Sequence, residues 1–452
     1  MIVLLPLVLS WLSAPVLLLL DGRRPAVAWS AFAILVLVAA IDIALLWAMV
    51  WEGREPFTTV AGGWATGSGI RLHVDRVSLF FGAVCAYVLA AVTAHEARGN
   101  VRSGSFPALI LFVSAGLHGA FFTGDLFNFY VFFEVSVVTS FALAAYGYGR
   151  EEVRGAFIYI VANLLGSSLF LVGIAVVYHT AGVLDLSILA QRQRETAGIH
   201  PLGAALLFAA LSLKLGLFPL HGWVPVLYSH AQPAVAAVMS GALINVGAYG
   251  LLRIGLDAAE GARAEAGTLL LALGAAAIVY GALLASRRKT PAEIIAYASI
   301  AQAGYLVLAF GAGGREGAAA ALLVVLSGSI EKAAMFLSQE SRGAARSLSA
   351  LVGALGVAGL PFTVGLLAKI ELFRAAVLAP YGPSLVGVIL LGTCFLFVAT
   401  LHFWDRVRRM PAPAAANMPA ALVLAATTVA LAVLAAPLNR MIFNLSADLV
   451  AE

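Results

Sequence analysis

Apolar stretches of about 20 residues alternate with short polar connections along almost the whole chain. A stretch of this length crosses the hydrocarbon core of a bilayer as a helix, because a helix satisfies its backbone hydrogen bonds internally. The pattern therefore predicts an all-α polytopic membrane protein with about fourteen transmembrane helices. The candidate spans lie near residues 2–20, 26–51, 74–95, 106–122, 125–148, 154–181, 201–230, 232–256, 267–285, 292–312, 316–338, 349–378, 384–405 and 415–436.

Two of these spans contain residues that break a helix. Pro219 and Pro225 interrupt the seventh span, and Gly359 and Pro361 interrupt the twelfth. A proline removes a backbone donor and clashes with the carbonyl four residues before it. Broken helices at matching positions of two halves are typical of transporters, in which they mark the transport site.

The two breaks suggest an internal duplication. We expect two inverted repeats of about five helices, each with a broken helix in fourth place. The first repeat would cover residues 106–256 and the second 267–405, with three helices before them (1–105) and a last helix and tail after them (406–452). An odd number of spans in each repeat would give the two copies opposite orientations in the membrane.

Composition agrees with a membrane protein, since 62% of the residues are hydrophobic and 11% are charged, against about 25% charged residues in soluble domains. No loop is long enough for a soluble catalytic domain, and no basic face suited to nucleic acid is present. Nucleotide-binding, hydrolase, metalloprotease, haem and iron–sulfur motifs are missing. We expect no cofactor, no metal and no redox or hydrolytic site in this chain, although it could be a membrane subunit of an enzyme complex. The apolar N-terminus is typical of a retained first helix.

Basic residues are distributed unevenly between the two sides of the predicted bundle. The loops that follow odd-numbered spans are shorter and carry more arginines, among them Arg98, Arg150, Arg287, Arg346 and Arg409. The positive-inside rule makes this side cytoplasmic. Both termini are then predicted to face the periplasm or the exterior of a cell (inner) membrane.

Three of the four lysines, Lys214, Lys332 and Lys369, lie inside predicted spans, whereas Lys289 lies in a charged loop. A charged side chain at the bilayer centre costs about 2.5–3.5 kcal/mol on insertion scales. A lysine removed from water can release its proton near neutral pH, whereas an arginine keeps its charge. This choice of residue indicates proton handling.

Glu134 is a carboxylate among phenylalanines in the middle of the fifth span, and a membrane lysine is its natural partner. Lys214 lies just before the break at Pro219, beside backbone that the proline leaves free to hold water. We expect Glu134 and Lys214 to form a pair that controls proton affinity. The alternatives are a purely structural ion pair for Glu134 and a lysine that reaches the membrane surface.

Other titratable side chains are secondary candidates. Lys369 lies in the second broken span, and Lys332 is expected to face inward more than its neighbour Glu331, since adjacent helical residues point about 100° apart. His221 and His230 follow the first break and could relay protons. Each could instead be structural or interfacial, as could the accessory candidates Asp42 and Glu371.

Several segments resemble a known family. They are Gly-Asp-Leu-Phe-Asn at 124–128 with Phe-Glu at 133–134, Pro-Leu-His-Gly-Trp-Val-Pro at 219–225, Gly-Ala-Tyr at 247–249 and Tyr-Ala-Ser-Ile-Ala-Gln-Ala-Gly-Tyr at 297–305. The chain resembles the proton-translocating antiporter-like subunits of respiratory complex I, energy-converting hydrogenases and multisubunit Mrp cation/proton antiporters, and the first segment is most similar to the Mrp D subunit. The resemblance covers residues 70–405.

The resemblance implies fourteen helices, two half-channels and a central polar axis that Glu134, Lys214, His221, Lys332 and Lys369 would line. It departs from the family at Asn245, where a lysine or histidine is usual, at Val226, where an acid is common, and at residues 327–329, where a histidine is expected. Water held by Asn245 and the serines could bridge these gaps.

Three hypotheses follow. In the first, the chain is an active proton-translocating subunit, coupled either to the export of Na⁺ or another cation or to electron transfer elsewhere in a redox complex. In the second, it is a non-conducting scaffold, as the loss of the basic residue at Asn245 suggests. The third is a stand-alone solute transporter. The first two imply other membrane subunits and the lipid bilayer as partners.

Overall fold

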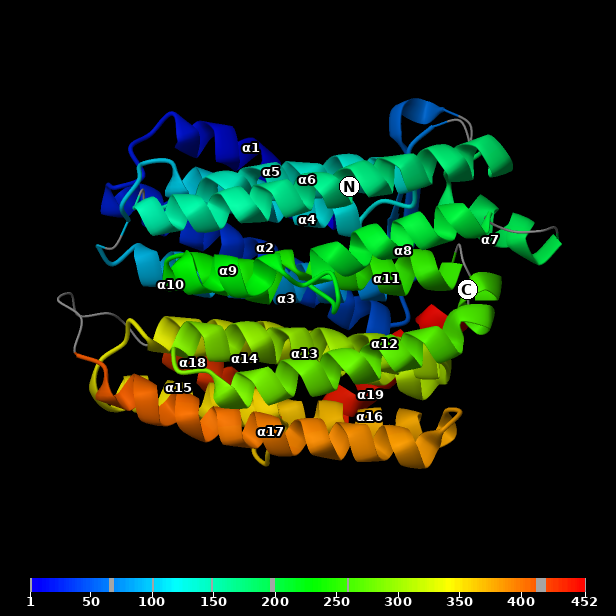
Figure 1. Cartoon of the computed structure of the whole chain (residues 1–452). Helices are drawn as coiled ribbons and strands as arrows, with labels where there is room; N and C mark the ends of the chain where they lie inside the picture. The colour runs from blue at the N-terminus through cyan, green and yellow to red at the C-terminus, as the bar shows by residue number, and fades with distance from the viewer. Residues whose placement is uncertain are drawn as a thin grey trace.

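The computed structural model describes residues 2–64, 69–99, 101–147, 149–195, 200–257, 260–411 and 420–451. Nearly all elements are helices that run side by side (Figure 1), with the first half of the chain (blue to green) in the upper group and the second half (yellow to red) in the lower one. The predicted all-α membrane fold is confirmed. In the first half the elements are η1 (Ile2–Leu4), α1 (Leu5–Leu18), α2 (Pro25–Trp51), β1 (Phe57–Val60), η2 (Ala61–Gly63), β2 (Arg71–Val74), α3 (Arg76–Glu96), α4 (Phe106–Phe121), α5 (Leu126–Ala144), α6 (Arg150–Ala181), α7 (Leu186–Glu195), α8 (Pro201–Leu215), α9 (Trp223–His230), α10 (Pro233–Val238), η3 (Met239–Leu243) and α11 (Asn245–Asp257).

The second half contains α12 (Glu260–Arg287), α13 (Pro291–Ala312), α14 (Gly314–Ser338), α15 (Gly343–Ala358), α16 (Val364–Leu378), α17 (Gly382–Arg409), α18 (Ala420–Val433) and α19 (Ala435–Ala451). Within the described residues, nine helices are long and apolar enough to cross a membrane, or ten if the bent pair α18–α19 is one span. A count of fourteen requires the broken and shorter helices to be added, so it stays a prediction. The predicted last span, 415–436, begins outside the described residues, and the expected tail is helical.

Both predicted helix breaks are present. The seventh candidate span divides into α8 and α9, and α8 ends where Gly216 takes a left-handed conformation (φ 69°) that a side chain would strain. The twelfth divides into α15 and α16 at Gly359, which is also left-handed (φ 78°). A third irregularity, not predicted, is η3, a π-helical turn between α10 and α11. Single π-turns of this kind are frequent at functional sites.

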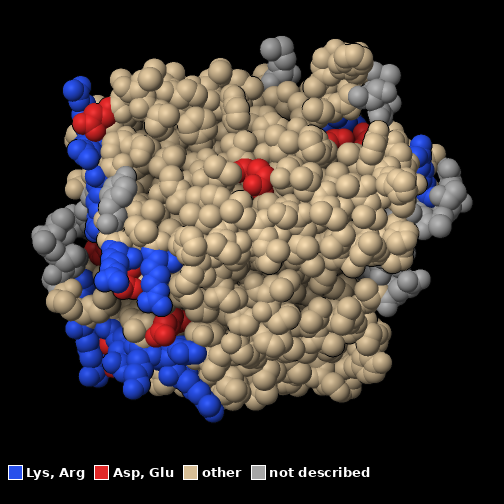
Figure 2. All heavy atoms as spheres, turned by 45° about the horizontal axis from the view of Figure 1, so that its top comes forward, with Lys and Arg blue, Asp and Glu red and all other residues tan. Residues whose placement is uncertain are grey.

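Burial separates central helices from peripheral ones. The apolar windows of α14 and of the α10–α11 span are 100% buried, and those of α13 and α3 are 89% and 83% buried, against 39% for α2 and α6 and 33% for α17. Figure 2 shows the corresponding surface: charged side chains gather at two opposite edges, and a broad uncharged belt with one acidic group lies between them. An apolar belt of this kind suits contact with lipid.

The long connection between α2 and α3 contains a small antiparallel hairpin, β1–β2, in which Phe57 pairs with Val74 and Val60 with Arg71. Asp75 follows the hairpin and caps α3 by accepting from the backbone N–H of Ser78 at 2.8 Å. Its other oxygen lies 2.7 Å from Nη1 of Arg253 on α11. The hairpin therefore anchors the start of α3 to the central helices.

Candidate functional site

Lys214 lies in the last turn of α8, directly before the break. The helical hydrogen-bond pattern ends at the break, where the carbonyl of Leu213 accepts from the backbone N–H of Gly216 at 3.0 Å and from Nε1 of Trp223 at 2.9 Å. The C-terminal end of a helix carries partial negative charge, which favours a cation there. The Lys214 side chain is buried, with 4% of it exposed. The break therefore holds the ammonium at a dry, electrostatically suitable position.

Glu134 on α5 and Lys214 form the predicted pair. Lys214 Nζ lies 3.6 Å from Oε1 of Glu134, and Ser167 on α6 bridges them: Nζ donates to the Ser167 hydroxyl at 2.9 Å, and this hydroxyl donates to Glu134. Lys214 also lies over the ring of Phe133, 4.7 Å from its centroid. A hydroxyl between an acid and an amine can pass a proton in either direction.

Two small cavities continue from Lys214 toward the second half of the chain. The first is bounded by Lys214, Asn163 and Ile244. The second, of about 30 Å³, is bounded by Ile244, Asn245, Ser329 and Lys332. A cavity needs about 10–15 Å³ and a few polar partners to hold a water molecule, and the second cavity meets both conditions.

Asn245, where the resemblance predicts a basic residue, binds the neighbouring helices. Its amide donates to the Ser329 hydroxyl of α14 at 2.8 Å and to the carbonyl of Gly241 at 3.1 Å. The π-helical turn η3 directly precedes it. Asn245 thus supplies a polar link to α14 at the point where the family has an ionisable side chain.

Lys332 and Glu331 occupy different sides of α14. Lys332 borders the cavity beside Asn245, whereas Glu331 points to the break between α15 and α16. Oε1 of Glu331 accepts from the N–H of Gly365 at 3.1 Å and from the Thr428 hydroxyl at 2.9 Å. Lys332 was expected to face inward more than Glu331, but both are buried, at 5% and 0% exposed, because α14 is enclosed on all sides.

The close approach of Glu331 to the break requires glycine. A Cβ on Gly356 would lie 2.3 Å from Oε1 of Glu331, and one on Gly359 would lie 2.3 Å from Cγ of Lys369. Lys369 on α16 is buried, and its Nζ has no hydrogen-bond partner within the described part of the chain. It lies 2.9 Å from the centroid of the Tyr305 ring and interacts electrostatically with Glu331.

The remaining candidates lie apart from these two lysine sites. His221 is in the connection between α8 and α9, with its ring 4.7 Å from that of Tyr280. His230, at the end of α9, lies 3.3 Å from Glu151. Asp42 on α2 lies 3.0 Å from Nε2 of His118 on α4, and both are fully buried. This pair joins a helix that precedes the first proposed repeat, α2, to the first helix of that repeat, α4.

Glu371 lies at the mouth of a further cavity. Its Oε1 is 2.7 Å from Nη1 of Arg374, and the cavity between α14, α16 and α19 is bounded by Glu371, Arg374, Asn439 and Arg440. The charged lining gives this end of the molecule a polar opening near Lys369.

Two residues of the site were missed from the sequence, Glu331 and Ser167. A carboxylate in the middle of the span 314–338 was a signal for Glu331, but it was set aside in favour of its neighbour. For Ser167, a polar side chain in mid-span was the only signal, and serines are common in membrane helices.

Comparison with known proteins places this geometry in context. The model of the NADH:quinone oxidoreductase/Mrp antiporter transmembrane family matches residues 123–396, more than half of the chain. NADH-quinone oxidoreductase subunit N of Desulforudis audaxviator (strain MP104C) is 33% identical over 344 residues, which cover 70% of this chain and 68% of the relative. Putative antiporter subunit mnhD2 of Staphylococcus aureus (strain MRSA252) is 29% identical over 340 residues, which cover 74% and 68%.

The fold has a close counterpart among solved structures. A chain in the structure of the Mrp complex from Dietzia sp. DQ12-45-1b superposes with a TM-score of 0.88 at 24% identity, with 99% of this chain and 97% of that chain covered. At this identity the match shows a shared fold.

Proposed function

The chain belongs to the NADH:quinone oxidoreductase/Mrp antiporter transmembrane family, and we propose that it is the proton-translocating, D-like membrane subunit of a multisubunit cation/proton antiporter. Protons would move through two half-channels joined by a buried axis of lysines, glutamates, histidine and water. The observation that carries the proposal is the Glu134–Ser167–Lys214 arrangement at a broken helix, 3.6 Å from acid to amine.

The first half-channel would load Lys214. Glu134 is partly exposed at the protein surface, with 19% of its side chain accessible, while Lys214 is buried. An opposite charge within about 4–6 Å stabilises an ammonium, so movement of Glu134 away from Lys214 would favour proton release. His221 lies in the same break and is the nearest predicted histidine along the chain.

The axis would then continue through water. The cavity beside Asn245 and Lys332 has room for a bridging molecule, and Asn245 can orient it, although an amide carries no proton of its own at neutral pH. From Lys332 the proton would reach the Glu331–Lys369 region and leave through the charged cavity at Glu371. Two inverted five-helix repeats would relate the two halves, with their breaks at α8–α9 and α15–α16.

The partners we propose are the other membrane subunits of the assembly, the lipid bilayer, protons, and Na⁺ or another exported cation. The arginine-rich loops would face the cytoplasm and both termini the opposite side. Coupling to electron transfer is the second candidate, because a relative is named as a subunit of NADH-quinone oxidoreductase. A non-conducting scaffold is the remaining alternative, motivated by Asn245.

A substitution at Lys214 tests the proposal. In the assembled complex reconstituted into vesicles, Lys214→Ala should reduce proton flux, followed with an internal pH dye, by about 100-fold or more, because it removes the amine that pairs with Glu134 at the break. Lys289→Ala is the matched control, since this lysine lies in an exposed loop, and it should conduct as the native protein does.

Assembly of the variant complex is checked by size-exclusion chromatography. Native flux in an intact Lys214→Ala complex would contradict the proposal and favour the scaffold. Coupling is read from the same vesicles: flux driven by a Na⁺ gradient supports antiport, and flux that requires an electron donor supports the redox alternative.

A further inference from the structure

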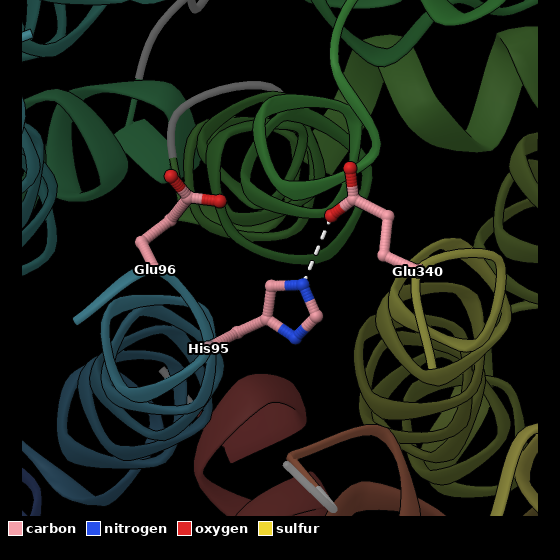
Figure 3. A group of neighbouring side chains, drawn as sticks. All are labelled: His95, Glu96 and Glu340. Atoms are coloured by element: carbon pink, nitrogen blue, oxygen red, sulfur yellow. Dashed lines mark hydrogen bonds and ion pairs between the residues drawn. The ribbon is translucent and has the colours of Figure 1, made fainter. Parts of the chain in front are cut away.

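A cluster of three ionisable side chains lies away from the proposed proton axis, at one end of the bundle. His95 and Glu96 are the last two residues of α3, and Glu340 lies two residues beyond the end of α14. Figure 3 shows the three side chains converging from the two helix ends, with His95 between the carboxylates. Neither the sequence patterns nor the proton pathway assigns them a role.

The donor atoms are close to one another. One nitrogen or oxygen from each of His95, Glu96 and Glu340 lies within 4.8 Å of the other two, and Nε2 of His95 is 2.9 Å from Oε2 of Glu340. His95 is 0% exposed and Glu96 4% exposed, whereas 25% of the Glu340 side chain is accessible. The cluster is therefore enclosed on the α3 side and open to solvent on the α14 side.

Two carboxylates this close repel each other unless a proton or a cation lies between them. The hydroxyl of Tyr146 donates to Oε2 of Glu96 at 3.0 Å, and Arg102 also interacts with Glu96. These contacts orient Glu96 and offset part of its charge. They leave Glu340 and the imidazole of His95 directed into the shared space.

We propose that His95, Glu96 and Glu340 bind a divalent transition-metal cation of the Zn²⁺ type. An imidazole nitrogen with two carboxylate oxygens is a ligand set typical of Zn²⁺, whereas Mg²⁺ and Ca²⁺ prefer oxygen ligands alone. Bond lengths of about 2.0–2.2 Å place tetrahedral donors about 3.3 Å apart. The three donors, which lie within 4.8 Å of one another, would close to that spacing on binding, and water would complete the coordination. This site was not expected from the sequence.

The metal would join the end of α3 to the turn that follows α14, which the His95–Glu340 hydrogen bond also links. Glu331 and Lys332 lie on α14, the helix that ends two residues before Glu340. A bound cation would therefore restrain the end of α14 against α3. Binding does not depend on proton conduction through the chain, so it can be tested whether or not the chain conducts.

Calorimetric titration of the metal-free assembled complex with ZnCl₂ tests the site. The native complex should show a site that His95→Ala weakens by at least about 30-fold. Glu340→Gln, which keeps a hydrogen-bonding partner for His95, should weaken it by about 10-fold or more. His402→Ala is the control, because this histidine contacts only a backbone carbonyl in the described structure, that of Ser286, and it should bind Zn²⁺ as the native complex does.

A spectroscopic measurement on the native complex tests the proposed ligands independently of whether the variants fold. Zinc X-ray absorption of the native complex loaded with one equivalent should show one imidazole and two or more oxygen ligands. An oxygen-only shell, or equal affinities for the native, His95→Ala and Glu340→Gln complexes, would overturn the proposal.

Discussion

The two buried lysines at helix breaks differ in how their surroundings treat a positive charge. Lys214 has a carboxylate at 3.6 Å and a bridging hydroxyl. Lys369 has an aromatic ring beneath it and no hydrogen bond to Nζ in the described structure. Glu331 is the acid that interacts electrostatically with Lys369. Its carboxylate accepts hydrogen bonds from the backbone N–H of Gly365 and from the hydroxyl of Thr428. The first half of the chain thus pairs its charges directly, and the second half holds them apart.

The position of each lysine relative to its break accounts for the difference. Lys214 ends a half-helix, where the helix dipole favours a cation. Lys369 follows the start of a half-helix, α16, and there the dipole favours an anion instead. Glu331 takes that place by accepting from Gly365 near the N-terminus of α16. The two breaks are therefore not equivalent: one presents its negative end to an ammonium and the other its positive end to a carboxylate.

Among substitutions that test the difference between the two breaks, the largest change in proton flux is expected on substitution of Glu331. Glu331→Gln keeps an acceptor for Gly365 and Thr428 but removes the charge, so proton flux in vesicles should fall by about 100-fold with little change in thermal stability. Glu331→Ala should in addition lower the free energy of unfolding by about 3 kcal/mol, because buried donors lose their partner. Both quantities are measured on the assembled complex.

Glu316→Gln, at the start of the same helix, serves as the control for Glu331 and should retain native flux. If Glu331→Gln conducts normally, the acid of the second half is structural, and only the first break handles protons.

A smaller loss of proton flux is expected on substitution of Ser167. This substitution tests whether protons pass between Glu134 and Lys214 through the serine hydroxyl or directly. Ser167→Ala leaves Glu134 and Lys214 in place but removes the hydroxyl between them, so flux should fall by about 10-fold. Ser168→Ala is the neighbouring control, since its hydroxyl donates to the Leu164 carbonyl of its own helix. Equal flux in the two variants would show that the acid and the amine exchange protons without the serine.

The effect with the least influence on proton flux lies outside both breaks and concerns stability in acid. Burial, opposed by Asp75, lowers the pKa of His73 in the β1–β2 hairpin from 6.5 to about 4. Between these values the unfolded chain binds the proton and the folded one does not, so stability falls as pH decreases through this window, by up to about 3 kcal/mol. Melting temperatures at pH 7, 5.5 and 4.5 should show this loss in the native protein and a weaker one in His73→Gln.

This measurement also helps to compare the two breaks. If proton flux falls at low pH, the melting temperatures show how much of that fall is caused by unfolding of the protein. If the melting temperature of His73→Gln falls with pH as much as that of the native protein, a group other than His73 causes the loss of stability in acid.

Much of the fold follows from local sequence signals. Apolar length located the helices, and proline and glycine located both breaks, because proline removes a backbone donor and glycine adopts the left-handed conformation at which α8 and α15 end. The pairing of Glu134 with Lys214 also followed from the sequence, since a buried acid needs a partner and the lysine lay beside a break.

Other features could not be predicted from the sequence, because they depend on how the helices pack against one another. Glu331 and Lys332 were treated as alternatives because they point in different directions, but a helix surrounded on all sides buries both. His230 and Asp42 have partners, Glu151 and His118, whose proximity depends on tertiary packing rather than on spacing in the chain. The His95–Glu96–Glu340 cluster joins residues 245 positions apart, beyond the reach of any motif.

The enclosure of α14 has a consequence for how the protein is made. Glu331 obtains its two hydrogen bonds from Gly365 and Thr428, which are 34 and 97 residues further along the chain. When α14 leaves the ribosome, Thr428 has not been synthesised, and the acid enters the membrane without this partner. Biogenesis must therefore keep α14 in a polar or chaperoned setting until α18 arrives, and nascent chains that stop before Thr428 are expected to be targets for membrane quality control.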